Sequence, residues 1–135
     1  MTGVPASDEV LAEMTCQSCH ATSPLNPDAV GRVRLDGLPE RWEPGQRYPL
    51  VLRVEHPGAD RQRWGFQLTA VDARTLLGAG RLVAADPETT QVIDGGMARR
   101  EYVEHTEAGT GLGRRSGMEW SFDWIAPAIV PPPAV

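Results

Sequence analysis

The sequence contains no lysine, so all 13 of its basic residues are arginines. Its 18 acidic residues outnumber them and give a formal net charge of −5, with an isoelectric point of about 5.1. Proteins that bind nucleic acid by its phosphates carry an excess of positive charge. The acidic balance therefore argues against nucleic acid as a partner.

Long apolar runs are also missing. A membrane-spanning helix needs roughly 18 or more consecutive apolar residues, and the longest apolar stretch, residues 124–135, contains four prolines. The first ten residues lack the basic start and apolar centre of a signal peptide. We expect that these residues do not span a membrane, and that any export signal has been removed or lies outside this numbering.

Helical periodicity is scarce after residue 30, whereas period-two alternation is common. Residues 118–124 place Met118, Trp120, Phe122 and Trp124 on one face of a strand and polar residues on the other. Turn residues such as Pro44 and Gly45 separate similar short segments. The other predicted strands cover residues 31–36, 48–55, 64–72, 79–84, 91–93 and 101–106.

These patterns predict an all-β fold, an antiparallel Ig-like or reelin-like β-sandwich in a single domain. An irregular N-terminal segment, residues 1–30, precedes the sandwich and includes a short helix at residues 7–15. The sandwich itself covers residues 31–126. A proline-rich, extended tail follows at residues 127–135, so we expect either an open sheet edge or another segment covering it.

Cysteine is almost absent, and its placement is informative. The two cysteines form Cys16-Gln17-Ser18-Cys19-His20, the C-x-x-C-H pattern of covalent c-type haem attachment. In such sites the two sulfurs bond to the haem vinyl groups and the histidine binds the iron. The motif predicts one haem c on Cys16 and Cys19, with His20 as the proximal iron ligand.

Three other interpretations of the motif stay open. A redox C-x-x-C normally opens a helix after a strand, and no such unit is predicted here. A zinc site would need a fourth ligand beside Cys16, Cys19 and His20. A disulfide between the two cysteines is grouped with the zinc site as an alternative to haem. The third alternative is that the motif occurs by chance.

The sixth iron ligand is open among several residues. His56 precedes Pro57 at the end of a predicted strand, and His105 lies within a strand on the same face as Val103. Met97 and Met118 are further candidates, because thioether sulfur also binds haem iron.

Taken together, these residues resemble the choice-of-anchor V domain, a relative of the reelin-type (Reeler) β-sandwich of exported bacterial proteins. The resemblance covers residues 2–128. It is carried by the C-x-x-C-H motif, the turn and strand at residues 44–48, residues 65–68, and Tyr102-Val103-Glu104-His105-Thr106. It implies covalent haem at Cys16 and Cys19, with His20 as a ligand, and it favours His105 as the distal ligand.

The main hypothesis is a monohaem c-type cytochrome domain that transfers electrons, ligated by His20 and His105. Its partner would be a redox protein or a membrane-bound electron-transfer complex, and its location periplasmic or cell-surface. The alternative is a reelin-like binding or assembly module in which the motif holds a structural haem or zinc. We do not predict an enzyme, because no nucleophile triad, carboxylate pair or phosphate loop is present.

Overall fold

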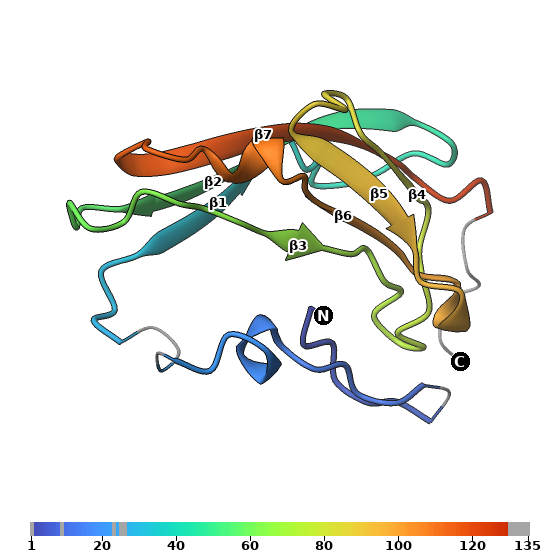
Figure 1. Cartoon of the computed structure of the whole chain (residues 1–135). Coiled ribbons are helices and arrows are strands. Elements are labelled where there is room, and N and C mark those ends of the chain that lie inside the picture. Colours follow the sequence, from blue (N-terminus) through green and yellow to red (C-terminus); the bar gives the residue numbers. More distant parts are fainter. Residues whose placement is uncertain (1, 9, 23, 25–26, 130–135) are drawn as a thin grey trace.

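The structure, a computed structural model, describes residues 2–8, 10–22, 24 and 27–129. Two antiparallel sheets pack face to face (Figure 1). The larger sheet contains, in spatial order, β1 (Arg32–Asp36), β2 (Arg47–His56), β7 (Ser116–Ile125) and β4 (Arg81–Val83). The smaller sheet contains β3 (Gln67–Leu68), β6 (Glu101–His105) and β5 (Thr90–Asp94).

The helical elements of the described residues are three short 3₁₀ turns: η1 (Cys16–Ser18), η2 (Met97–Arg99) and η3 (Ala108–Thr110). The predicted all-β antiparallel sandwich is therefore confirmed. Within the described ranges, no helix has the length and apolar character needed to cross a bilayer.

The core lies between the sheets, and the alternating pattern of β7 forms its centre. Trp120 and Phe122 are 1% and 0% exposed, while Met118 and Trp124 pack against the same cluster from its borders. The predicted inward face of residues 118–124 is confirmed. The turn before β2 is also as predicted, because Gly45 adopts a φ of +73° and Gln46 N donates to Glu43 O.

The segment predicted as a strand over residues 64–72 pairs in a ladder only at Gln67–Leu68. Trp64 and Phe66, which alternate along this segment, are both buried. The strand is shorter because its backbone finds other partners. Trp64 N donates to Thr110 O, and Phe66 N lies 3.0 Å from Nδ1 of the His105 imidazole.

The helix predicted at residues 7–15 is wrong. These residues instead form a narrow hairpin, in which Ser7 N donates to Val10 O and Glu13 N donates to Val4 O. Leu11 and Met14, which would have formed part of the apolar helix face, are exposed. A short amphipathic helix is marginal without a surface to cover its apolar face. The side chain of Glu13 is also committed to the sandwich.

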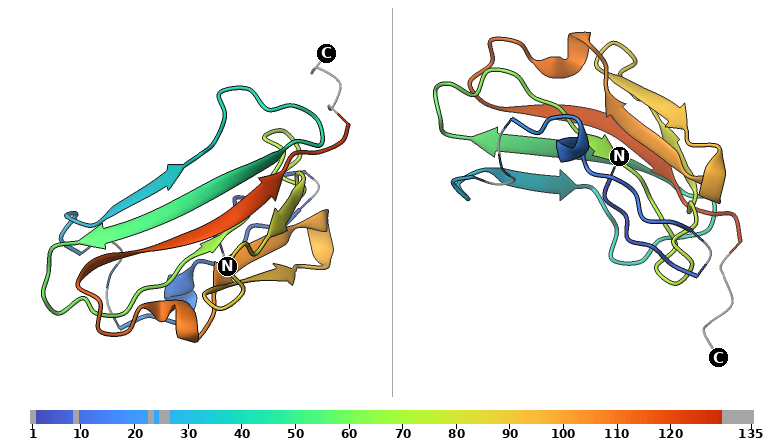
Figure 2. Two further views of the ribbon diagram at one scale, coloured as in Figure 1. Left: turned by 90° about the horizontal axis from the view of Figure 1, so that it is seen from above. Right: turned by 60° about the horizontal axis from the view of Figure 1, so that its bottom comes forward.

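The N-terminal segment crosses beneath the sandwich as a separate layer, under β3 and β1 (Figures 1 and 2). This position is not obvious from the sequence, because the segment forms no strand of either sheet. Most of the predicted tail at 127–135 lies outside the described residues, so its extended form stays a prediction.

Candidate functional site

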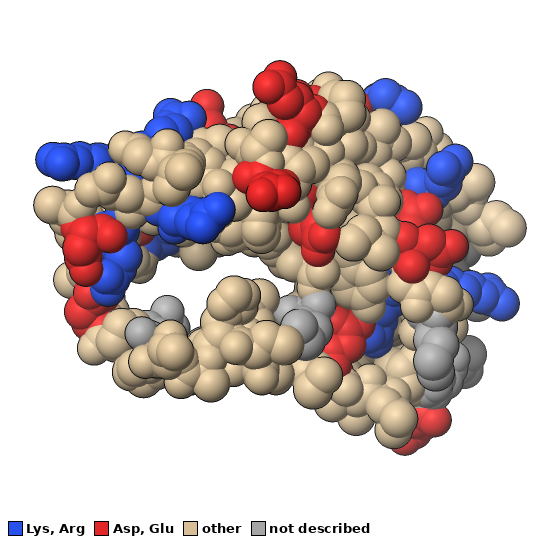
Figure 3. All heavy atoms as spheres, viewed as in Figure 1, with Lys and Arg blue, Asp and Glu red and all other residues tan. Residues whose placement is uncertain are grey.

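A cavity of about 690 Å³ opens between the N-terminal segment and the smaller sheet. Its volume is within the range of small-molecule and cofactor pockets. Figure 3 shows the hollow between the two layers. The described residues that line it are Cys16, Cys19, His20, Arg63, Trp64, Gly65, Phe66, Gln67, Glu104, His105 and Thr110.

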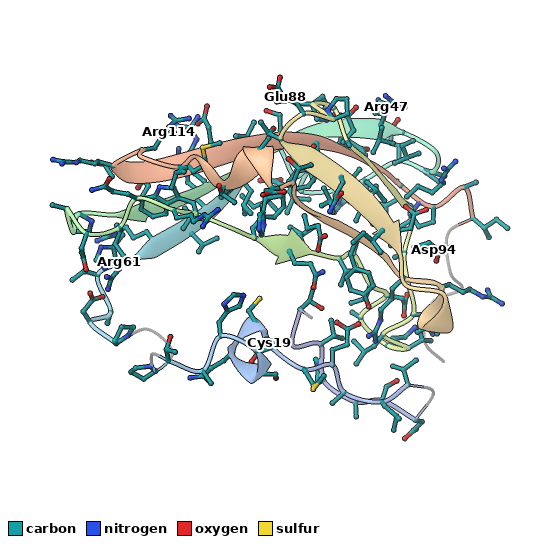
Figure 4. The ribbon with its side chains drawn as sticks, in the orientation of Figure 1. Cys19, Arg47, Arg61, Glu88, Asp94 and Arg114 are labelled. Atoms are coloured by element: carbon teal, nitrogen blue, oxygen red, sulfur yellow. The ribbon has the colours of Figure 1, made fainter. Side chains whose placement is uncertain are left out.

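The C-x-x-C-H motif forms one wall of this cavity as a single helical turn. Cys19 N and His20 N both donate to Cys16 O, at 3.2 and 3.0 Å. In a helical turn, residues i, i+3 and i+4 lie on the same side. Cys16, Cys19 and His20 accordingly all line the cavity, and Figure 4 labels Cys19 at the turn beneath β3.

Both cysteines are exposed to solvent. The described residues contain no group of three or more His, Cys, Asp or Glu side chains arranged to hold a metal ion. The fourth ligand that a zinc site would need is therefore not brought to Cys16, Cys19 and His20 by the part of the chain that the structure describes.

His105 lies on the opposite wall, at the end of β6. Its Nδ1 is 3.0 Å from Phe66 N and 3.1 Å from Phe66 O, so the Phe66 backbone holds the ring. The ring also lies against Gly65, where an added Cβ would approach it to 2.7 Å. Any larger residue at this position would force the His105 ring to shift.

The ring of His105 keeps one nitrogen available. Among the described residues, Nε2 has no hydrogen-bond partner. When Nδ1–H donates to Phe66 O, the lone pair lies on Nε2, which is the tautomer that binds a metal. In that tautomer, Phe66 O gives His105 the support that metal-ligating histidines usually receive from a backbone carbonyl.

His56 differs from His105 because both of its ring nitrogens are engaged. Gly58 N donates to Nδ1 at 2.9 Å, and Nε2 lies 2.9 Å from a carboxylate oxygen of Asp28. The residue closes the end of β2 and is outside the described lining of the cavity. Its contacts explain it as a structural histidine.

The two methionine candidates are also not found in the described lining of the cavity. Met118 packs against the core from β7, and its sulfur accepts a hydrogen bond from Arg114 Nη1 at 3.2 Å. Met97 begins η2, and its side chain lies outside the described part of the structure. His105 is thus the sequence-derived distal candidate that the described fold brings to the motif.

Several residues of the cavity were missed by sequence reasoning. Glu104 accepts hydrogen bonds from Gln67 and Gln91, at 2.8 Å each, in a ladder that crosses all three strands of the smaller sheet. Arg63 is exposed, and the aromatic walls are Trp64 and Phe66. The alternation of residues 64–68 and 101–106 indicated strand faces, but the cross-strand register that joins them is tertiary information.

Glu13 anchors the N-terminal segment to the sandwich. Its carboxylate contacts the guanidinium of Arg100 and accepts a hydrogen bond from Tyr102 Oη, while Thr2 Oγ1 donates to its other oxygen. Arg100 is only 2% exposed and also donates to Leu76 O. Burial raises the pKa of Glu13, but the hydrogen bonds from Thr2, Tyr102 and Arg100 outweigh it and lower that pKa from 4.5 to about 2.

A second anchor lies beyond the motif at Asp28. Its carboxylate is 2.9 Å from His56 Nε2 and 3.8 Å from Arg61 Nη2. A hydrogen bond from Val30 N and the contact with His56 lower the pKa of Asp28. The C-x-x-C-H turn is therefore held between two points at which the segment contacts the sandwich.

Comparison with known proteins yields structural similarity only. No family model and no curated protein matches this chain. Two crystal structures of the human F-spondin reeler domain are similar, with a TM-score of 0.46 and 23% identity. A crystal structure of the Reelin-N domain of F-spondin has a TM-score of 0.45 and 24% identity.

These similarities cover 73% of this chain and 64–65% of those chains, so this chain spans just under two thirds of their length. They concern the arrangement of strands and say nothing about a haem, a ligand or a partner. The more specific resemblance to the choice-of-anchor V family stays a prediction, because no family model matches.

Proposed function

We propose that this chain is a monohaem c-type cytochrome domain that transfers electrons. Cys16 and Cys19 hold the haem covalently, and His20 and His105 bind the iron. One observation carries the proposal: the C-x-x-C-H turn and His105, separated by 85 positions in the sequence, line the same cavity from different layers of the fold.

The residues around the cavity fit such a group. Two thiols and an imidazole lie on one face of a helical turn, and a second imidazole, that of His105, lines the same cavity. Trp64 and Phe66 supply aromatic surface suited to a porphyrin. When bound, the haem supplies an iron that gains and loses one electron.

The chain's own residues determine what that iron can do. Phe66 O orients His105 through Nδ1, and Gly65 leaves room for the ring. With His20 and His105 as its two protein ligands, a bound haem iron would have no position open for a substrate. This arrangement suits electron transfer and does not suit peroxidase-type chemistry.

The proposal extends to location and partner. Haem is attached to C-x-x-C-H motifs outside the bacterial cytoplasm, so we propose a periplasmic or cell-surface location. We propose as partner a redox protein or a membrane-bound electron-transfer complex. Both follow from the chemistry of the haem.

The test is an absorption spectrum of protein made with haem-attachment machinery, followed by a pyridine haemochrome assay on the denatured chain. We expect a sharp reduced α-band and haem that remains on the denatured polypeptide. The double variant Cys16→Ala/Cys19→Ala should lose the covalent haem, whereas Ser18→Ala, in the same turn, should keep it. Haem that stays on the denatured double variant would contradict the attachment sites.

The alternative function is a reelin-like binding or assembly module, in which the motif holds a structural haem or zinc. The same preparation separates the two. Protein that carries zinc and no haem, although attachment machinery was present, would establish the alternative. Bound haem that cannot be reduced and reoxidised would indicate a structural haem.

A further inference from the structure

Four arginines gather at one end of the sandwich, on two loops that lie side by side. The first loop, residues 57–66, links β2 to β3 and carries Arg61 and Arg63, and the second, residues 106–115, leads into β7 and carries Arg114 and Arg115. We call these four residues the arginine end.

Backbone hydrogen bonds hold the two loops together. Trp64 N donates to Thr110 O and Gly113 N donates to Gln62 O, at 2.8 Å each. The indole of Trp64 also donates to Arg114 O at 3.0 Å. The arginines are therefore presented by a joined pair of loops and not by independent tips.

The arginine end has the opposite charge to the molecule as a whole. The two loops contain four arginines, together with Asp60 and Glu107, for a formal charge of +2, whereas the whole chain carries −5. Arg61 pairs with Asp60 and Asp28. The other three arginines form no ion pair with the described residues. Figure 3 shows blue spheres at the end where Figure 4 labels Arg61 and Arg114, with some red among them.

The arginine end borders the haem cavity. Arg63 and Thr110 both line the cavity, one from each loop. Leu112, two residues before Arg114 in the second loop, is 75% exposed. An apolar side chain among arginines is typical of protein interfaces, in which arginine is enriched and lysine is depleted.

We propose that the arginine end docks an acidic surface of a redox partner protein and brings that partner to the edge of the cavity. This inference rests on the proposed function. Arginine suits the role because its planar guanidinium binds carboxylates with two hydrogen bonds. Among the described residues of these loops, Leu112 is the large apolar side chain that is strongly exposed. One such side chain provides little apolar surface for insertion into a lipid bilayer, so a protein partner is favoured.

The sign of the salt dependence of electron transfer tests this inference. The reduced haem protein is mixed with ferricyanide, an anion, and with hexaammineruthenium(III), a cation, over a series of ionic strengths. A net charge of −5 acting as a whole would repel ferricyanide, so its rate would rise with salt. Docking at the arginine end predicts the reverse, a ferricyanide rate that falls as salt is added.

Arginine variants locate the effect. Arg63→Gln/Arg114→Gln/Arg115→Gln should lower the ferricyanide rate at low ionic strength by about tenfold. Arg114→Gln/Arg115→Gln, which leaves the cavity lining intact, should lower it in part while the absorption spectrum stays unchanged. The matched control is Arg41→Gln/Arg47→Gln/Arg81→Gln. It removes the same charge, and its Arg47 and Arg81 lie opposite Ile125, at the far end of β7.

The outcomes separate this inference from the proposed function. Protein without haem overturns both. Protein with bis-histidine haem, but with a ferricyanide rate that rises with salt or an equal loss in the control, overturns the docking surface alone. Co-sedimentation with phosphatidylglycerol vesicles that is lost in Arg114→Gln/Arg115→Gln would assign the arginine end to a membrane and would also overturn it.

Discussion

At the residue scale, the candidate site depends on how His105 is held. A strand histidine is usually a half-exposed polar residue, and period-two alternation cannot distinguish such a residue from a ligand. The distinguishing contacts are the Phe66 backbone at Nδ1 and the close approach of Gly65 to the ring. They hold the imidazole in the wall of the cavity.

The first prediction concerns His105 as an axial ligand. His105→Ala should convert a low-spin haem spectrum to a high-spin one, because it removes one of two strong-field ligands. Added imidazole should restore the low-spin spectrum. Optical and electron paramagnetic resonance spectra would measure both effects.

His56→Ala is the control, since both nitrogens of that ring already have partners. It should leave the spin state unchanged. An unchanged spectrum in His105→Ala would exclude His105 and return attention to Met118, Met97 and His56.

The second prediction concerns Glu104, which lines the cavity beside His105. Its carboxylate receives hydrogen bonds from two neutral amides and has no cationic partner among the described residues. A nearby negative charge stabilises the oxidised iron, which carries one more positive charge. Glu104→Gln should therefore raise the reduction potential by about 60 mV, a tenfold change in the redox equilibrium.

Potentiometric titration would measure this change. The matched control is Glu88→Gln, which removes the same charge from the face opposite Cys19 (Figure 4). It should shift the potential far less. Equal shifts in the two variants would show that net charge, and not position in the cavity wall, is responsible.

At the element scale, the N-terminal segment contributes the C-x-x-C-H turn without belonging to either sheet. Its hairpin is held to the sandwich chiefly through Glu13, which contacts Arg100 and Tyr102, 87 and 89 residues further along the chain. A buried guanidinium is costly without its partner. Glu13 therefore stabilises both the position of the segment and the burial of Arg100.

The third prediction concerns the pH dependence of this anchor. The folded pKa of Glu13, about 2, lies below its ordinary value of 4.5. The stabilisation is therefore fully present above pH 4.5 and is lost as the pH falls from 4.5 towards 2. It amounts to roughly 3 kcal/mol from the shift in pKa.

Denaturant unfolding at a series of pH values would test this dependence. Glu13→Gln should be less stable than the unaltered chain at neutral pH, and the difference should shrink below pH 4. Glu40→Gln, at an exposed loop position, should follow the unaltered chain throughout. A stability difference for Glu13→Gln that stays constant from pH 7 to pH 2 would contradict the ionised anchor.

At the scale of the whole molecule, the fold places the N-terminal segment and the sandwich on either side of a cavity. It also gathers four arginines at one end of an acidic molecule. The predicted sandwich and the inward face of β7 follow from alternation, because burial on one side of a strand imposes a period of two. The helix at residues 7–15 was wrong because a period of 3.6 over nine residues does not specify a helix that lacks a partner surface. The length of β3 was overestimated because the backbone that precedes it contacts Thr110 O and the His105 side chain instead of extending the ladder with β6.

The sequence by itself predicted haem attachment at the motif. Cys16, Cys19 and His20 are local, and one helical turn is enough to place them on the same side. It also determined the class of fold, because the alternation of apolar and polar residues along a strand is a local pattern. Only the tertiary structure decided that His105 lines the same cavity as the motif, how Glu13 fixes the segment, and how four arginines from two loops form one surface. These depend on cross-strand register and on contacts between residues far apart in the chain, which no local pattern encodes.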